Sequence, residues 1–196
     1  MNRNTVESAF HFYKQYHIEE AAAKFDDFRP IMQNIHFENG YAYASDGHMV
    51  VKAKIEHISN LTAEMINKLN GKNINWRVFQ KLRTLDENSW ISEITDKGIL
   101  VETNSYLFSC SINYNFTDDK YPNCENVIDT IFDHEVNNIG VNIDNLKRLQ
   151  KAFVSSKKYM VFRYSGDTSI INVESYELFQ DDIDIHGYVM PLAIDW

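Results

Sequence analysis

The chain has 196 residues and a mass of 22.9 kDa, with 44% hydrophobic and 24% charged residues, so it can bury a core without disulfides or a structural metal. It contains no run of 18 apolar residues and begins with a polar segment, which predicts neither a transmembrane helix nor a signal peptide. Its two cysteines, Cys110 and Cys124, lack CxxC spacing, which is typical of a reducing cytoplasm. A net charge of −9 argues against nucleic-acid binding only if the charge is evenly spread.

The first third of the chain predicts a helix followed by strands. Residues 18–28 carry apolar residues at helical spacing, and Pro30 should end that helix. Residues 31–38 and 41–45 predict a hairpin around Asn39-Gly40, because that dipeptide favours the positive φ angles of a tight turn. A second turn at Asp46-Gly47 leads into a strand over 48–55.

The rest of the chain alternates between amphipathic helices and short strands. Helices are expected over 60–70, 75–85 and 144–153, the first closed by Gly71. Strands are expected over 90–95, 99–103, 106–114, 139–143, 159–164, 169–174 and 188–194, with an acidic connection over 115–138. This element order predicts an α+β protein.

The charge is strongly segregated along the sequence. Residues 64–83 hold five basic residues against one acid, residues 144–158 hold the same, and the remainder has 9 basic against 26 acidic residues. In both helices most of the basic side chains lie off the apolar stripe and should face solvent. Such a face could follow a phosphate backbone, although a merely solvated basic helix face is the alternative.

The middle and the C-terminal third resemble each other at an offset of 67 residues. Residues 74–82 align with residues 141–149, and both segments continue into paired strands. With a similar pattern near the N-terminus, this predicts three half-units, 1–57, 58–125 and 126–196. The first two would form one domain, 1–125, and the last a half-domain.

Three segments resemble the bacterial sliding clamp, the beta subunit of the replicative DNA polymerase. Residues 29–50 match its R-P-x-L, hairpin and A-T-D-G-H pattern, ending in Ser45-Asp46-Gly47-His48-Met49-Val50. Residues 118–127 match its proline loop, and residues 188–192 match its C-terminal V-M-P motif. The resemblance covers roughly residues 18–196.

This resemblance implies the DNA-clamp, or processivity-factor, fold, in which helices line a hole and sheets form the rim. The expected activity is non-specific binding of double-stranded DNA by an oligomeric, non-enzymatic processivity factor without cofactors. The predicted DNA-binding residues are Lys72, Arg77, Lys81, Arg83, Lys147, Arg148 and Lys151.

The same motifs line the peptide pocket of the family, where a DNA polymerase or another replication or repair protein docks a short linear motif. Carried over by position, the predicted pocket consists of Ser45, Gly47, His48, Met49, Val50, Pro122, Val127, Tyr188, Met190 and Pro191. Methionine suits adaptable surfaces, but ordinary core packing is the alternative for Met49 and Met190.

Two departures from the family pattern stand out. Met49 occupies the place of an arginine, and the chain continues after its proline motif as Ala193-Ile194-Asp195-Trp196. Rings of this superfamily contain twelve half-units, so a ring with three per chain would require a homo-oligomer of four copies. The alternative is a monomer or dimer that does not encircle DNA. The reduced size suggests a phage or mobile-element version.

Two other classes of function compete with the clamp. The sequence lacks the HExxH, GxSxG, P-loop and GxGxxG patterns, and Asp181, Asp182, Asp184 and His186 suit a solvated loop better than a metal site. A clamp-fold module could instead bind a replication-protein peptide, or a clamp, without encircling DNA. It would keep the pocket and make no use of the basic helices.

Overall fold

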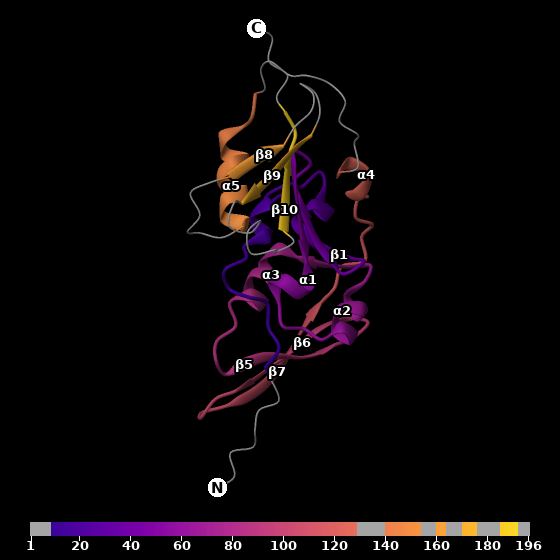
Figure 1. The fold of residues 1–196 in the computed structure, drawn as a ribbon. Coiled ribbons are helices and arrows are strands. Elements are labelled where there is room, and N and C mark those ends of the chain that lie inside the picture. Colours follow the sequence, from indigo (N-terminus) through magenta and orange to yellow (C-terminus); the bar gives the residue numbers. More distant parts are fainter. Residues whose placement is uncertain (1–8, 129–139, 154–159, 164–169, 176–184, 192–196) are drawn as a thin grey trace.

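The structure is a computed structural model that describes residues 9–128, 140–153, 160–163, 170–175 and 185–191, with the side chains of Val127 and Ser175 left out. Two antiparallel sheets and several short helices form an α+β architecture (Figure 1). In the described part of the chain, no helix is both long and apolar enough to span a membrane.

A seven-stranded sheet with the order β4-β1-β2-β3-β10-β9-β8 forms the centre of the molecule. Its strands are β1 (Asn34–Glu38), β2 (Tyr41–Ser45), β3 (Met49–Lys54), β4 (Lys72–Asn75), β8 (Met160–Arg163), β9 (Ile171–Ser175) and β10 (Ile185–Val189). The predicted β1–β2 hairpin is confirmed, because Asn39 and Gly40 have φ angles of 51° and 82°.

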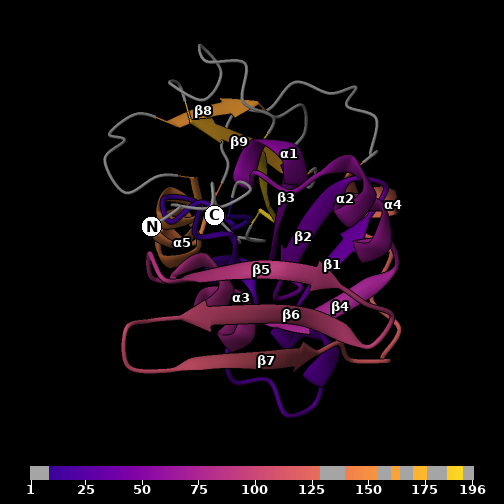
Figure 2. The same ribbon diagram turned by 90° about the horizontal axis from the view of Figure 1, so that it is seen from below.

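A second sheet has the order β5-β6-β7 and consists of β5 (Ser89–Ile94), β6 (Gly98–Asn104) and β7 (Ser109–Asn115). Figure 2 shows these strands side by side, with β7 at the outer edge. Their positions agree with the predicted strands, except that β7 begins at Ser109 and not at residue 106.

Two amphipathic helices confirm the sequence prediction: α3 (Trp76–Arg83) and α5 (Ile143–Phe153). Asn75 caps α3 by accepting a hydrogen bond from the Arg77 amide. The other helices are α1 (Ile55–Ile58), α2 (Ala63–Leu69), α4 (Glu125–Ile128) and two 3-10 turns, η1 (Ile18–Ala21) and η2 (Pro30–Gln33).

The seven-stranded sheet separates two layers of side chains. Alternate residues of β3 show this, because Met49 and Val51 enter the main core while Val50 joins a smaller cluster on the opposite face. The main core also receives Phe79 of α3 and Leu149 of α5. Helices α3 and α5 therefore cover one face, which we call the helix face; we call the other face the outer face, and Figure 1 shows α4 on the side away from α5.

The predicted helix over 18–28 is wrong. Only η1 is helical, and Phe25 is 87% exposed instead of lying on a buried stripe. The Asp26 carboxylate accepts hydrogen bonds from the Phe28 and Arg29 amides, which holds the backbone in a turn. Pro30 begins η2 instead of ending a helix.

Strand pairing connects distant parts of the sequence. Strand β4 pairs with β1, and β10 pairs with β3, so residues 34–75 and 160–189 share one sheet. The predicted strand over 139–143 is wrong at its end, because α5 begins at Ile143, and residues 129–139 lie outside the described residues. The division into three half-units stays a prediction.

Candidate functional site

The fold brings the predicted pocket segments together. The turn at Asp46-Gly47 leads directly into β3, which pairs with β10 so that Val50 lies opposite Tyr188. The pairing continues past the strand, since the Met190 amide donates to the His48 carbonyl at 2.9 Å. The proline-loop segment reaches the same face, because Tyr121 and Cys124 belong to one cluster with Val50.

This cluster forms an aromatic and aliphatic layer on the outer face. Its buried members are Tyr43, Val50, Tyr121, Cys124, Ile170 and Tyr188. The Tyr121 ring stacks on His36 of β1, with the two ring centroids 5.0 Å apart. The His36 ring is fixed in turn by Asn73 of β4, whose side-chain oxygen lies 2.8 Å from Nδ1. The loop is therefore anchored to β1 directly and to β4 through Asn73, whose side-chain amide donates to the Asp119 carbonyl.

A charged group borders the aromatic layer. The Glu125 carboxylate accepts a hydrogen bond from the Tyr43 hydroxyl and lies 2.8 Å from the Lys52 ammonium. Burial alone would raise the pKa of Glu125, but Lys52 and Tyr43 lower it below its usual value. Burial and the nearby Glu125 charge raise the pKa of Tyr43 and bring that of Cys124 to about 12. Both side chains therefore stay protonated at neutral pH.

The predicted pocket residues divide into buried and exposed groups. Ser45 is buried, and its hydroxyl donates to the Met49 carbonyl, which closes the turn. Met49 is 1% exposed and belongs to the main core on the helix face, which agrees with core packing, the alternative for this residue. The exposed members are Gly47, His48, Pro122 and Met190, whereas Pro191 is half-buried and the Val127 side chain lies outside the described residues.

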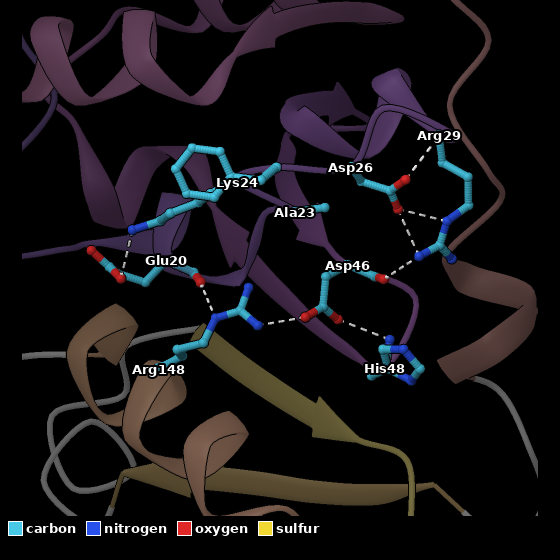
Figure 3. Close-up of a pocket in the computed structure, with 9 residues that line it drawn as sticks. Glu20, Ala23, Lys24, Asp26, Arg29, Asp46, His48 and Arg148 are labelled. Atoms are coloured by element: carbon cyan, nitrogen blue, oxygen red, sulfur yellow. Dashed lines mark hydrogen bonds and ion pairs between the residues drawn. The ribbon is translucent and has the colours of Figure 1, made fainter.

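A charged depression of about 440 Å³ lies beside the Asp46-Gly47 turn (Figure 3). Asp46 accepts hydrogen bonds from the His48 and Met49 amides and pairs with the Arg148 guanidinium. On the other side, Arg29 pairs with Asp26 at 2.8 Å and donates to the Asp46 carbonyl. These ion pairs neutralise one another, so the depression presents no net charge from its paired groups.

The helix face carries exposed cations. Arg77 and Lys81 project from α3, and Lys147 and Lys151 project from α5. Arg77 stacks over the Trp76 ring at 5.1 Å, and Lys147 pairs with Asp144 at 3.0 Å. Segment η1 packs against both helices, which places the two sets of cations on the same layer of the molecule.

Comparison with known proteins identifies the architecture. No protein-family model matches the sequence, and no curated protein is similar to it. A DNA polymerase sliding clamp from Pseudomonas aeruginosa is similar in structure, with 15% identity and a TM-score of 0.55 over 98% of this chain and 69% of that chain. A sliding clamp from Bartonella birtlesii bound to griselimycin gives 12% identity and a TM-score of 0.62 over 99% and 69%.

The chain has the DNA sliding-clamp fold. The Helicobacter pylori beta clamp bound to a DNA ligase peptide has the same fold, with 9% identity and a TM-score of 0.56 over 98% of this chain and 68% of that chain. The chain therefore spans about two thirds of the length of these clamps. The α+β clamp fold expected from the sequence is confirmed.

Within this clamp fold, two predicted DNA-binding arginines bind to the η1 segment. Arg83 is 5% exposed, and its Nη2 lies 2.7 Å from the carboxylate of Glu19 in η1. Arg148 donates to the backbone carbonyls of Glu20 and Ala22 at 2.7 and 3.0 Å. Both were predicted as DNA contacts because charge alone cannot distinguish a solvent-facing arginine from one that ties the helix to η1.

Lys72 also differs from the other predicted DNA contacts. It lies on β4 and not on a helix, and its ammonium donates to the Asp96 carbonyl at 3.2 Å. Among the described residues, the exposed predicted contacts of the clamp fold are Arg77, Lys81, Lys147 and Lys151.

Sequence reasoning missed the aromatic and charged residues of the outer face of the clamp fold. His36, Tyr41, Tyr43 and Lys52 occupy alternate positions of β1, β2 and β3, which places them all on one side of the sheet. The alternation of tyrosine and alanine in residues 41–44 was a readable signal for such a face. Glu125 had no such signal, because its role depends on where the proline loop docks.

The competing metal site cannot be placed. Asp181, Asp182 and Asp184 lie outside the described residues, and His186 of β10 lies 3.1 Å from Glu174 of β9. In the part of the chain that the structure describes, no group of three or more potential ligands could hold a metal ion.

Proposed function

We propose that the chain is a non-enzymatic DNA sliding-clamp-like processivity factor. It binds duplex DNA without sequence preference through α3 and α5 and docks client peptides on the outer face. The observation that carries this proposal is that two features lie on opposite faces of the seven-stranded sheet. The exposed cations lie on the helix face, and the three motif segments meet on the outer face.

The DNA-binding part rests on charge without base-reading chemistry. Arg77, Lys81, Lys147 and Lys151 are long, flexible cations on helix surfaces, which suits contacts to phosphates. Each neutralised phosphate contributes about −0.9 to the slope of log affinity against log salt concentration. If all four contact phosphates, one chain should give a slope of about −3.6.

The test measures binding of a labelled DNA duplex by fluorescence anisotropy at several salt concentrations. The variant R77E/K81E should weaken binding at least tenfold and make the salt slope shallower. The matched control K97E/K120E changes the net charge equally at exposed lysines outside both helices and should bind nearly as well as the parent chain. Equal loss in both variants would mean that net charge, and not the helix face, governs binding.

The peptide-docking part rests on the segments that meet beside the Asp46-Gly47 turn. His48, Pro122 and Met190 are exposed next to a buried aromatic layer, so a peptide could add apolar contacts there without unfolding the sheet. The DNA ligase peptide bound in the Helicobacter pylori clamp is a suitable probe. Titration calorimetry should show weaker binding for H48A/M190A than for K97A/K120A, and equal affinities would contradict the docking site.

A second function is favoured by one specific observation. Arg83 pairs with Glu19 and Arg148 donates to the Glu20 carbonyl, so the helix face has fewer cations available for DNA than the sequence suggested. A clamp-fold module that binds a replication-protein peptide or a clamp without gripping DNA would keep peptide affinity and show no salt-dependent DNA binding. The two titrations above distinguish these functions. Either protein would work in the cytoplasm.

A further inference from the structure

The last strand of the three-stranded sheet has an unusual sequence. From Phe108 to Phe116 every even-numbered residue is apolar and every odd-numbered residue is serine or asparagine. The even-numbered residues share the face of the sheet that contains the buried Val101, because Ile112 lies opposite it. This face is only partly covered: Tyr114 and Phe116 pack against the core, while Ile112 is 46% and Phe108 is 56% exposed.

Strand β7 is also an open edge. It pairs with β6, and no other described strand pairs with its far side. Proteins normally protect such edges with charges, prolines or bulges. None of these devices occurs over Ser109–Asn115: the segment contains no charged residue and no proline, and its register with β6 is regular.

The backbone hydrogen bonds show which groups remain available. The Phe116 amide donates to Lys97, and the Phe108 carbonyl accepts from Ser105, so the even-numbered residues bond toward β6. The N–H and C=O groups of the odd-numbered residues therefore point to the open edge; these residues are Ser109, Ser111, Asn113 and Asn115.

We propose that β7 pairs with β7 of a second copy in an antiparallel, two-fold symmetric joint centred on Ile112. In this register Ser111 of one copy lies opposite Asn113 of the other, so available groups meet available groups. Ile112 faces Ile112 of the second copy, Cys110 faces Tyr114, and Phe108 faces Phe116. The exposed Phe108 of each copy thus covers the half-buried Phe116 of the other copy.

The absence of charge on β7 permits a second copy as its partner. A self-pairing edge in a chain of net charge −9 would set like charges against each other unless the edge is neutral, and β7 is neutral along its length. In a pairing with an identical strand, every apolar residue from Phe108 to Phe116 faces another apolar residue. The inference concerns assembly and does not depend on DNA binding or peptide docking.

The joint has a geometric consequence for the three-stranded sheet. A two-fold axis through an antiparallel strand pair stands perpendicular to the sheet, so the same face of each sheet stays on the same side. The faces that contain Val101 and Ile112 in the two copies would then point the same way. A ring built from such pairs would have alternating orientations of its subunits.

The test uses the full chain and measures its mass by light scattering over a concentration series. The parent chain should reach the mass of two copies or a multiple of two. The variant S111K/N113K places lysine opposite lysine across the joint and should raise the dissociation constant roughly tenfold or more. The variant S111K/N113E places lysine opposite glutamate at the same sites and should restore the assembly.

A second measurement tests the register. In a C110S background, I112C should form a disulfide between copies under mild oxidation, because directly opposite residues of this pair type lie about 4.5 Å apart at Cα. The control N113C faces Ser111 of the other copy and should not link. A parent chain that stays monomeric, equal masses for the two charge variants, or equal linking by both cysteines would each overturn the proposal.

Discussion

Replacement of Arg148 by methionine separates a structural role from a DNA-binding role. The guanidinium makes two charge-assisted hydrogen bonds to the carbonyls of Glu20 and Ala22 and pairs with Asp46. At about 1.5 kcal/mol for each bond to a carbonyl, reduced little because the side chain is 27% exposed, these bonds contribute about 3 kcal/mol. The ion pair between the partly exposed Arg148 and Asp46 adds about 1 kcal/mol.

The neighbouring residue on α5 is the matched control. Lys147 is 64% exposed and pairs only with the exposed Asp144 among the described residues, so K147M should lower the free energy of unfolding by less than about 0.5 kcal/mol. Urea denaturation should show a loss of about 4 kcal/mol for R148M. DNA affinity, measured below the unfolding transition, should fall for K147M and not for R148M. The reverse pattern, a stable R148M with weakened DNA binding, would refute the assignment of Arg148 to η1.

Three further predictions concern the sheet and the outer face. G187A should destabilise the protein by about 1–3 kcal/mol in urea, because a Cβ there would lie 2.7 Å from Phe153 and 2.9 Å from Leu149; no loss would mean that α5 packs less closely on β10. Mass spectrometry after alkylation at pH 8 should find Cys110 labelled much faster than Cys124, whose pKa is raised to about 12 by burial and by Glu125; similar rates would contradict the buried outer-face cluster. The pKa of Glu125 is lowered in the folded state, so its contribution to stability is present above its usual value of 4.5 and is lost as the pH falls through the lower folded value. The stability difference between the parent chain and E125Q should shrink over that acidic range, and a difference independent of pH would argue against the Lys52 pairing.

Local patterns in the sequence predicted the local structure well. The Asn39-Gly40 turn and the apolar stripes of α3 and α5 each depend on residues a few positions apart, and each is present. The predicted helix over 18–28 failed for one tertiary and one local reason. The buried Glu19 pairs with Arg83 of α3, and the Asp26 carboxylate accepts hydrogen bonds from the Phe28 and Arg29 amides. Helical periodicity encodes neither interaction.

The candidate site was predictable in its segments and not in its contacts. Resemblance to the clamp pointed to residues 45–50 and 188–191, and β3 and β10 do pair there. The register of β3 decides which face of the sheet each of its side chains lies on. Met49 therefore lies in the main core, and its neighbour Val50 lies on the outer face. The alternation in residues 41–44 placed Tyr43 on one face, but the contacts that His36 and Tyr43 make with Tyr121 and Glu125 depend on where residues 115–125 dock, which the sequence alone does not show.

The pairing of β3 with β10 shapes how the chain must fold. Strand β3 lies in the first third of the sequence, whereas its partner β10 ends at Val189. The central sheet is therefore incomplete until nearly all of the described chain has been synthesised. Contacts of such large sequence separation slow folding, because a long loop must be closed before they form. Until then one edge of β3 has no partner strand, and newly made chains would be vulnerable to aggregation on the ribosome. Slow folding and a raised risk of aggregation before β10 pairs are therefore the expected consequences of this topology.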